Sequence, residues 1–178
     1  MPWLWYGHDG AGRTWPPPAS ERWDPHRIEP SLPAHVVEVA RRARARLLAG
    51  DVRELPVLAG HADLSGHNTT WLDDRAVVHD WDSIVAAPEA VLAGSSAADC
   101  MSHEGSRLAS TAEMDRYLAA YAEARGRAWT AAEVEVAHAT GAWVAAYDAA
   151  FEHLKDGPYP RSDRLGVDGE ERLERASA

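Results

Sequence analysis

Two long helix-forming stretches constrain the fold of this chain more than any other feature. Residues 110–126 open with the capping-box pair Ser110 and Glu113, and residues 130–157 open with the same device, a threonine followed three residues later by a glutamate. Each stretch carries apolar side chains at helical spacing, and each ends at a glycine, which is typical of a helix C-terminus. The pattern predicts two long helices.

A third, amphipathic helix is expected over residues 34–48, where apolar positions recur at three- and four-residue steps between arginines. Residues 1–33 are rich in tryptophan and proline and have no sustained period, so they predict an irregular arm that packs its indoles on the domain or on a partner. Residues 158–178 are polar, and we expect a tail with a terminal helical turn or two. The expected organisation is one domain, residues 34–157, between an arm and a tail.

Extended segments lie between the first helix and the two capped ones. The apolar run LPVLAG (55–60) predicts a short buried strand, and TTWLDDRAVVHDW predicts a hairpin with strands at 69–72 and 75–81 and a turn at 73–74. A further helix is expected to begin at Pro88. Together these segments predict an α+β fold that is mainly α-helical, with a small β-hairpin near the middle of the chain.

The charge balance and composition exclude some partners. The 178 residues carry a formal net charge of -10, whereas binding to nucleic-acid phosphates needs clustered lysine and arginine. The chain has one lysine, Lys155, and one cysteine, Cys100, which excludes an intrachain disulfide. It has no apolar run of membrane-spanning length and no signal-peptide pattern. We therefore expect a cytoplasmic protein with no nucleic-acid and no membrane partner.

The loop between the first strand and the hairpin concentrates the residues that carry chemistry. Its sequence, GHADLSGHN (60–68), places Asp63 five residues before Asn68, and Asp80 follows at the end of the returning strand. Phosphoryl transfer to an alcohol uses a carboxylate that orients the hydroxyl and accepts its proton, together with oxygen ligands for the magnesium that bridges the nucleotide phosphates. Asp63 suits the first role, and Asn68 and Asp80 suit the second.

These motifs resemble those of the aminoglycoside phosphotransferase and choline kinase family, the small-molecule branch of the protein-kinase-like fold. That family's loop reads H-G-D-x-x-x-x-N and its metal aspartate lies in a motif such as I-D-W-D, whereas this chain has HADLSGHN and VHDWDS. The resemblance implies Asp63 as the catalytic base, with Asn68 and Asp80 as magnesium ligands. It implies that His61 orders the loop. Ala62 stands where the family has glycine.

The resemblance also implies a fold and a reaction. Residues 34–157 would form the C-terminal lobe of a protein-kinase-like fold, with the catalytic and metal motifs on the small β-hairpin and its flanks. The reaction would be Mg²⁺-dependent transfer of a phosphoryl group from ATP, or another nucleoside triphosphate, to a hydroxyl of a small-molecule substrate. In the family a β-rich N-terminal lobe with a phosphate-binding lysine precedes the loop. Here the 60 residues before His61 contain no lysine, so the nucleotide lobe is expected to be missing.

Two consequences of a missing lobe stay open, as does the acceptor. In one, a separate chain supplies the nucleotide lobe. In the other, the chain is a catalytically dead remnant of the kinase fold that acts as a binding module through its tryptophan-rich arm. The carboxylates that would suit a cationic acceptor, aminoglycoside-like or otherwise, are Asp99, Glu104 and Asp115, although solvated helix faces explain them equally well.

Two further interpretations compete with the kinase-like one. Asp63 and Asn68 are both residue types that favour turns, so the loop can be explained by its backbone conformation alone. A metal-dependent hydrolase would instead use a histidine-rich transition-metal site to activate water, although the spacing matches no zinc hydrolase motif. Its ligands would be His61, Asp63, His67 and either His79 or Asp80.

Overall fold

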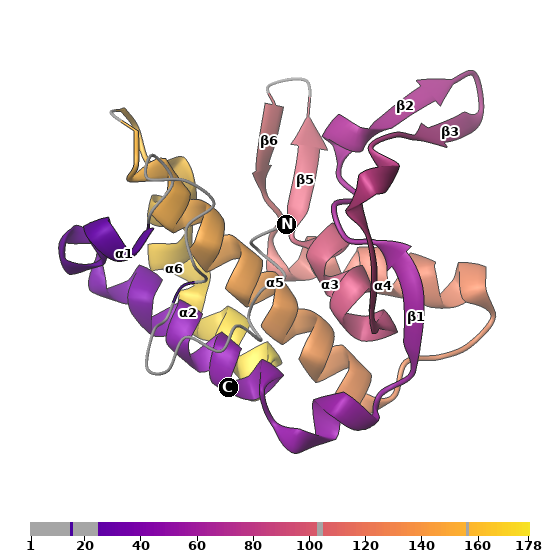
Figure 1. The fold of residues 1–178 in the computed structure, drawn as a ribbon, viewed down its shortest axis with the longest axis horizontal. Coiled ribbons are helices and arrows are strands. Elements are labelled where there is room, and N and C mark those ends of the chain that lie inside the picture. Colours follow the sequence, from indigo (N-terminus) through magenta and orange to yellow (C-terminus); the bar gives the residue numbers. More distant parts are fainter. Residues whose placement is uncertain (1–14, 16–24, 103–104, 156) are drawn as a thin grey trace.

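The computed structural model describes residue 15 and residues 25–102, 105–155 and 157–178. These residues form an α+β fold that is mostly helical, with small antiparallel sheets at one side (Figure 1), which confirms the expected fold class at this level. The five longer helices are α2 (Ala34–Leu47), α3 (Glu89–Ala97), α4 (Thr111–Arg125), α5 (Ala131–Glu152) and α6 (Pro160–Arg175). A short helix, α1 (Pro25–Ile28), and a 3₁₀ turn (Glu29–Ser31) precede α2.

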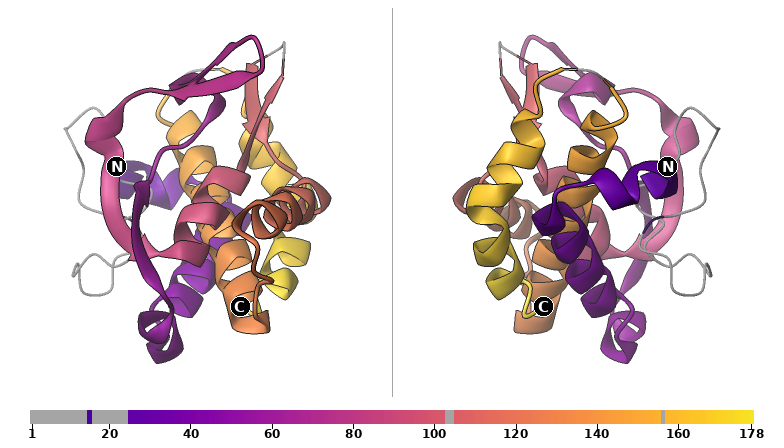
Figure 2. Two further views of the ribbon diagram at one scale, coloured as in Figure 1. Left: turned by 90° about the vertical axis from the view of Figure 1, so that its right-hand side faces the viewer. Right: turned by 90° about the vertical axis from the view of Figure 1, so that its left-hand side faces the viewer.

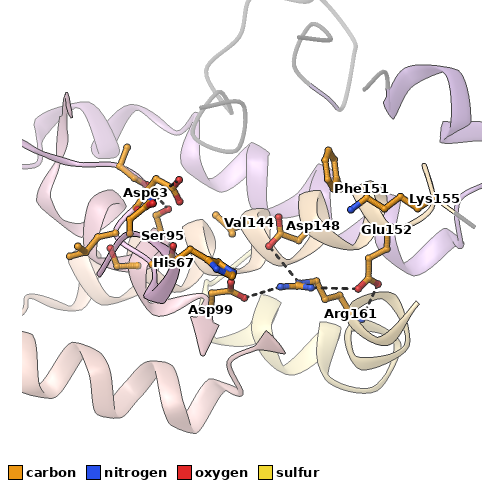
Figure 3. A pocket seen from close by; sticks show the side chains of 15 residues that line it. Asp63, His67, Ser95, Asp99, Val144, Asp148, Phe151, Glu152, Lys155 and Arg161 are labelled. Carbon is orange, nitrogen blue, oxygen red and sulfur yellow. Dashed lines mark hydrogen bonds and ion pairs between the residues drawn. The ribbon is translucent and has the colours of Figure 1, made fainter. Parts of the chain in front are cut away.

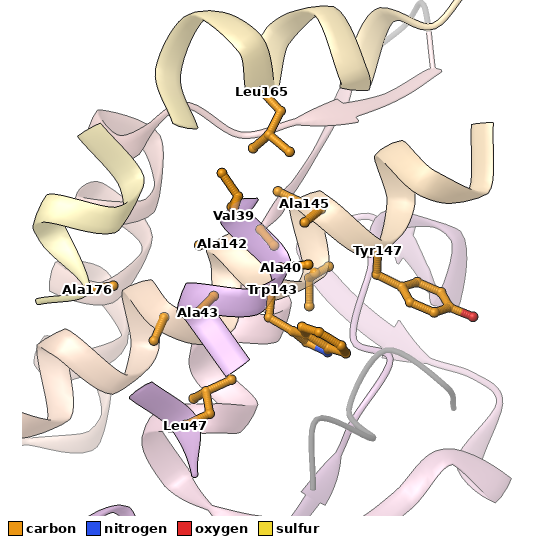
Figure 4. Packing of buried hydrophobic residues seen from close by; sticks show 14 of the residues in the cluster. Val39, Ala40, Ala43, Leu47, Ala142, Trp143, Ala145, Tyr147, Leu165 and Ala176 are labelled. Atoms are coloured by element: carbon orange, nitrogen blue, oxygen red, sulfur yellow. The ribbon is translucent and has the colours of Figure 1, made fainter. Parts of the chain in front are cut away.

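Helix α5 forms the centre of the core. It packs against α2 and α6 on one side and against α3 on the other (Figures 1 and 2). Most of its residues are buried, and many are alanines, so the neighbouring helices can approach closely (Figure 4). The closest approach is at Gly94 of α3, where an added Cβ would lie 2.2 Å from the carbonyl oxygen of Ala137. A side chain at position 94 would therefore push α3 away from α5.

The two capped helices begin as predicted. The Ser110 hydroxyl accepts a hydrogen bond from the Glu113 amide, and Thr130 and Glu133 form the same arrangement at the start of α5. Helix α4 ends at Gly126, which has a φ of 70° and so adopts the left-handed conformation that glycine tolerates best. Helix α5 ends earlier than the predicted limit of Gly157, because the chain turns away after Glu152.

The sheets explain how two distant loops meet. The predicted strand forms as β1 (Val57–His61), but it is not buried, because only His61 of its five residues is buried. It pairs antiparallel with β4 (Ile84–Pro88), with His61 opposite Ile84. The predicted hairpin forms between them, from β2 (Thr69–Leu72) and β3 (Arg75–Val78). Since β1 ends where β4 begins, residues 62–68 and 79–83 lie at the same end of the β1–β4 pair.

The helix expected from Pro88 is shorter than the sequence pattern suggested. It ends at Ala97, and residues 99–102 form strand β5 (Asp99–Ser102), which pairs with β6 (Gly105–Leu108). Cys100 therefore lies in a strand, not in an apolar helix. Hairpin pairing with the next strand, β6, overrides the helical pattern here.

The expected polar tail is a sixteen-residue helix, α6, that packs on the core. Although most of its residues are polar, the helix is amphipathic: Leu165 and Leu173 form an apolar stripe that is buried against α2 and α5. Several of its charges are also buried, because they pair with one another. Arg172, which is 1% exposed, donates to both carboxylate oxygens of Asp168 and to the carbonyl oxygen of Ala109.

The predicted packing of the arm is confirmed for the one tryptophan that the structure describes. Trp15 is fully buried, with ring-centroid distances of 5.9 Å to Trp143 and 6.4 Å to Tyr147. Its indole belongs to the main core cluster with these two α5 side chains. The other three tryptophans of the arm lie outside the described residues. Among the described helices, none is both long and apolar enough to cross a membrane.

Candidate functional site

His61 ties the two loops together. Its Nε2–H donates to the carbonyl oxygen of His79 at 2.8 Å, and its Nδ1 accepts from the backbone N–H of Asp63 at 3.1 Å. The ring is buried and meets Trp81 edge-on at 5.6 Å between centroids. Because both ring nitrogens are engaged within the protein, His61 fixes the backbone at Asp63 and has no nitrogen left for a substrate or metal.

Asp63 and Asn68 form a pair across the loop. The Asn68 side-chain NH₂ donates to the carboxylate of Asp63 at 3.0 Å and to its carbonyl oxygen at 2.9 Å. The +5 spacing reaches back because the chain makes a 3₁₀ turn at Gly66–Asn68. The side-chain nitrogen of Asn68 donates both hydrogen bonds, so its amide oxygen is not used in the contact with Asp63. The same bonds would also stabilise a purely structural turn.

The electrostatic surroundings of Asp63 favour a proton acceptor. Its side chain is half-buried, and this burial is the main cause that raises the pKa of its carboxyl above the ordinary value. The hydrogen bond from Asn68 lowers the pKa and partly opposes the burial, and the nearby charge of Asp80 raises it. Asp63 is therefore a carboxylate held in a partly desolvated position beside a second carboxylate.

Asp80 lies close to Asp63 but outside the cavity described below. It adopts the left-handed conformation, with a φ of 60°, and its carbonyl oxygen accepts from Ser83 at the start of the turn into β4. Its side chain is exposed and makes no hydrogen bond or ion pair with another residue in the described part of the chain. Over the same residues, no group of three or more histidine, cysteine, aspartate or glutamate side chains is arranged to hold a metal ion.

A cavity of about 410 Å³ opens beside Asp63, and α3, β5, α5 and α6 complete its wall (Figure 3). Asp63 and His67 lie at one end, Asp99 and Asp148 near the middle, and Lys155 at the other end. The polar side chains that line it include four carboxylates and two cations. They are Asp63, Ser65, His67, Asn68, Ser95, Ser96, Asp99, Asp148, Glu152, Lys155 and Arg161.

Arg161 is the cation nearest to the carboxylates of the wall. Its guanidinium lies 3.5 Å from Asp99, 3.8 Å from Asp148 and 3.7 Å from Glu152. Burial, the nearby charge of Asp99 and weaker charges beyond it raise the pKa of Asp148 to about 7, and Arg161 only partly offsets them. The wall is therefore electronegative, with more carboxylates than one arginine can neutralise.

Some of these residues were expected from the sequence and some were not. Asp99 lines the cavity, as a carboxylate suited to a cationic acceptor would. Asp115 does not, because it pairs with His138 at 2.9 Å and Arg175 at 3.0 Å, and Glu104 lies outside the described residues. No sequence motif identified the remaining wall residues, although Asp148 and Glu152, four residues apart on one helix face, were a usable signal. The missed residues are Asp148, Glu152, Lys155 and Arg161.

The other histidines of the two loops differ in position. His67 lines the cavity, whereas His79 lies outside it and bonds the Thr70 hydroxyl at 2.9 Å. The ligand set that a hydrolase would need is therefore spread over different surroundings. Comparison with known proteins assigns no family: no protein-family model, curated protein or solved structure matches this chain.

Proposed function

We propose that this chain is the catalytic part of a small-molecule phosphotransferase, with the fold of the C-terminal lobe of a protein kinase. The observation that carries the proposal is the Asp63–Asn68 pair at one end of an acidic cavity. It combines a carboxylate of raised pKa with a neighbouring amide oxygen, next to a space large enough for a small acceptor. These are the parts that phosphoryl transfer to an alcohol requires from this side of the site.

Asp63 would act on the hydroxyl of the acceptor. Its carboxylate accepts the hydroxyl proton as the oxygen bonds to the terminal phosphorus of ATP, and the bond from that phosphorus to the bridging oxygen of ADP breaks. A raised pKa makes the carboxylate a stronger proton acceptor than an ordinary aspartate. The hydrogen bond from Asn68 engages one carboxylate oxygen and leaves the other for the acceptor.

Asn68 and Asp80 are the residues that would hold magnesium. Their chemistry fits, because the amide oxygen of Asn68 and the carboxylate of Asp80 are hard oxygen ligands without a described protein partner. The charge of Asp80 also disfavours the ionised form of Asp63, a repulsion that a divalent cation would relieve. When bound, magnesium would neutralise charge on the phosphates of the nucleotide.

The cavity favours an acceptor that carries positive charge. Four carboxylates line it against one lysine and one arginine, and Arg161 is already shared by three of the carboxylates. An amine-bearing alcohol, aminoglycoside-like or smaller, would place its ammonium group near Asp99 and Asp148 and a hydroxyl near Asp63. The cavity volume suits a small molecule better than a polymer.

The nucleotide side of the site is incomplete in this proposal. The single lysine of the chain, Lys155, lies at the end of the cavity far from Asp63 (Figure 3), so it is poorly placed for phosphates bound near Asp80. Magnesium held by Asn68 and Asp80 would supply positive charge for the phosphates, and a nucleotide-binding partner would add to it. Trp81 and Ile84, which are 58% and 50% exposed beside Asp80, offer such a partner an apolar surface.

A binding module without catalysis is the second candidate, and the same surface favours it. Trp71, on the hairpin, is also 69% exposed. The arm is less suitable than the sequence suggested, because Trp15 is buried in the core of its own chain. In this candidate the partner would bind the hairpin, and the loop residues would have no chemical role.

Nucleotide binding separates the two candidates. We expect calorimetry of the wild-type chain with a non-hydrolysable ATP analogue to show binding that requires magnesium, and Asp80→Asn to weaken it about tenfold or more. Asp74→Asn, which removes an exposed carboxylate of the hairpin turn, is the matched control and should bind normally. Absence of binding by the wild-type chain in magnesium would remove the catalytic proposal and leave the binding module.

A further inference from the structure

The one ion pair of Asp148 among the described residues is long. The Arg161 guanidinium lies 3.8 Å from Asp148, and it also lies within 4 Å of Asp99 and Glu152. By contrast, Arg107 and Glu113 approach to 2.7 Å, and Arg127 and Glu133 to 2.6 Å. Asp148 therefore shares a distant guanidinium with two other carboxylates.

Asp148 has the least favourable position in this group. It lies on α5 with its side chain 29% exposed, between Asp99 of β5 and Glu152 one turn further along the same helix. Its nearest cation is Arg161 of α6, at 3.8 Å. The charge of Asp63, from the loop after β1, also acts on it. Three carboxylates on three elements thus oppose the ionisation of Asp148.

Two other titratable groups share this cavity. His67 lies toward the Asp63 end with its ring near Asp99, and the Lys155 ammonium lies over the Phe151 ring (Figure 3). Among the described residues, neither forms an ion pair with Asp148. Tyr147 precedes Asp148 on α5, and burial raises the pKa of its hydroxyl to about 12. The Tyr147 hydroxyl stays neutral at physiological pH, so it adds no charge near Asp148.

We infer that Asp148 holds a proton when the cavity is empty and releases it when a positively charged group of the acceptor enters, so that the wall exchanges a proton for the cation of its ligand. The identity of that ligand rests on the proposed function, but the exchange does not involve ATP or magnesium. A cation inside the cavity supplies the positive charge that Arg161 alone does not.

The cation affinity of the cavity should increase with pH. Because burial and the neighbouring carboxylates raise the pKa of Asp148 to about 7, the wall gains a negative charge as the pH rises through neutrality. Cation affinity should therefore be low at acidic pH and increase with pH. The ionised fraction of a group with such a pKa rises about tenfold between pH 6 and pH 8, which sets the largest change expected.

The first test uses the free protein. We expect carboxyl-carbon NMR of the wild-type chain to show an aspartate that titrates near pH 7, and the resonance to be absent in Asp148→Asn. Asp99→Asn removes a repelling neighbour and should lower the midpoint, which keeps the test decisive if Asp148→Asn does not fold. The control Asp74→Asn should leave the midpoint unchanged. If no aspartate titrates above about pH 6, the inference fails.

The second test uses choline as the probe, because its quaternary ammonium cannot titrate. Calorimetry in two buffers of different ionisation enthalpy should show release of up to about half a proton per choline at pH 7, where the empty site is half protonated, and an affinity that rises up to about tenfold from pH 6 to pH 8. Asp148→Asn should abolish both effects. Choline binding without proton release, or no choline binding at pH 8, overturns the inference. Proton exchange in a protein that does not transfer phosphate would overturn only the proposed function.

Discussion

Asp168 and Asp148 both lie within the helical part of the molecule and beside an arginine, but their charges are compensated very differently. Asp168 receives hydrogen bonds from Arg172 at 2.8 and 2.9 Å and from Arg164 at 2.8 Å. Asp148 has only Arg161 at 3.8 Å, and two other carboxylates share that arginine. Asp168 belongs to the packed surface between α6 and the rest of the core, whereas Asp148 faces a cavity.

The difference in ion pairing between Asp168 and Asp148 indicates which of the two charges contributes to stability. A buried charge that is fully paired is what a stable fold requires, because an unpaired one costs several kcal/mol. A charge left poorly compensated at a cavity is retained at a cost in stability, and such groups are concentrated at functional sites. On this basis we infer that the Asp168 site is structural, and we propose that the wall around Asp148 serves ligand binding.

The largest stability effect is expected on the α6 side. Arg172→Met should lower the free energy of unfolding by about 3–5 kcal/mol, because it leaves the Asp168 charge without its main partner and the Ala109 carbonyl without its donor. Arg164→Met is the matched control, since Arg164 binds the same carboxylate but is 48% exposed, and it should cost less than about 1 kcal/mol. Urea unfolding curves measure both. Equal losses would contradict the distinction between buried and exposed pairing.

A smaller loss is expected at the start of α5. Glu133 is 2% exposed, and the hydrogen bonds from Arg127 lower the pKa of its carboxyl to about 2. Glu133→Gln should cost roughly 2 kcal/mol near neutral pH. Because the folded-state pKa is depressed, this stabilisation is present above the ordinary pKa of glutamate and is lost as the pH falls toward 2.

Denaturant unfolding at neutral and acidic pH measures this loss. The difference between wild type and Glu133→Gln should shrink as the pH is lowered. Glu113→Gln removes the equivalent capping residue of α4, whose side chain is 23% exposed, and should cost less. A difference that stays constant from neutral pH to about pH 3 would show that the carboxylate charge contributes nothing.

In the cavity wall, removing a carboxylate charge should stabilise the folded protein. Asp148→Asn should raise the free energy of unfolding at pH 8 by up to about 4 kcal/mol, because it removes a charge that the folded protein accommodates poorly. The folded-state pKa is raised to about 7, so the wild type loses stability as the pH rises from the ordinary pKa of aspartate through neutrality. The gain from the variant should therefore vanish near pH 4.

Thermal or urea unfolding between pH 4 and pH 8 measures this gain. Asp74→Asn serves as the control, because it removes a carboxylate from an exposed turn and should change stability little at either pH. If Asp148→Asn destabilises the protein at pH 8 as much as Glu133→Gln does near neutrality, Asp148 is structural and the comparison with Asp168 does not hold.

The sequence predicted the elements whose signals are local. The capping boxes at Ser110 and Thr130, the left-handed cap at Gly126 and the turn of the β2–β3 hairpin depend on residues a few positions apart, and the structure has all of them. The sequence did not predict β5, because the apolar pattern that begins at Pro88 was extended through Cys100 and Met101, which instead pair with β6 in a short hairpin. Helix α6 was missed because Asp168 and Arg172 look solvated until their pairing is known.

The candidate site divides in the same way. The Asp63–Asn68 contact follows from a spacing of five residues within one loop, so a motif could identify it. The opposite wall could not be assembled from the sequence, because Asp99, Asp148 and Arg161 come from β5, α5 and α6 and meet only through the packing of these elements. The positions of these residues in the sequence do not predict that packing.

A phosphoryl-transfer assay with Asp63 altered is the most direct test of the proposed role of the Asp63 loop. Wild-type protein, with ATP, magnesium and an amine-bearing alcohol, should form ADP and a phosphorylated acceptor, and Asp63→Asn should reduce the rate by about 10²–10⁴-fold while its unfolding curve stays close to that of the wild type. Asp74→Asn should keep the full rate. Transfer that is unaffected by Asp63→Asn, or a wild-type chain that forms no phosphorylated acceptor, would contradict the proposed role of this loop.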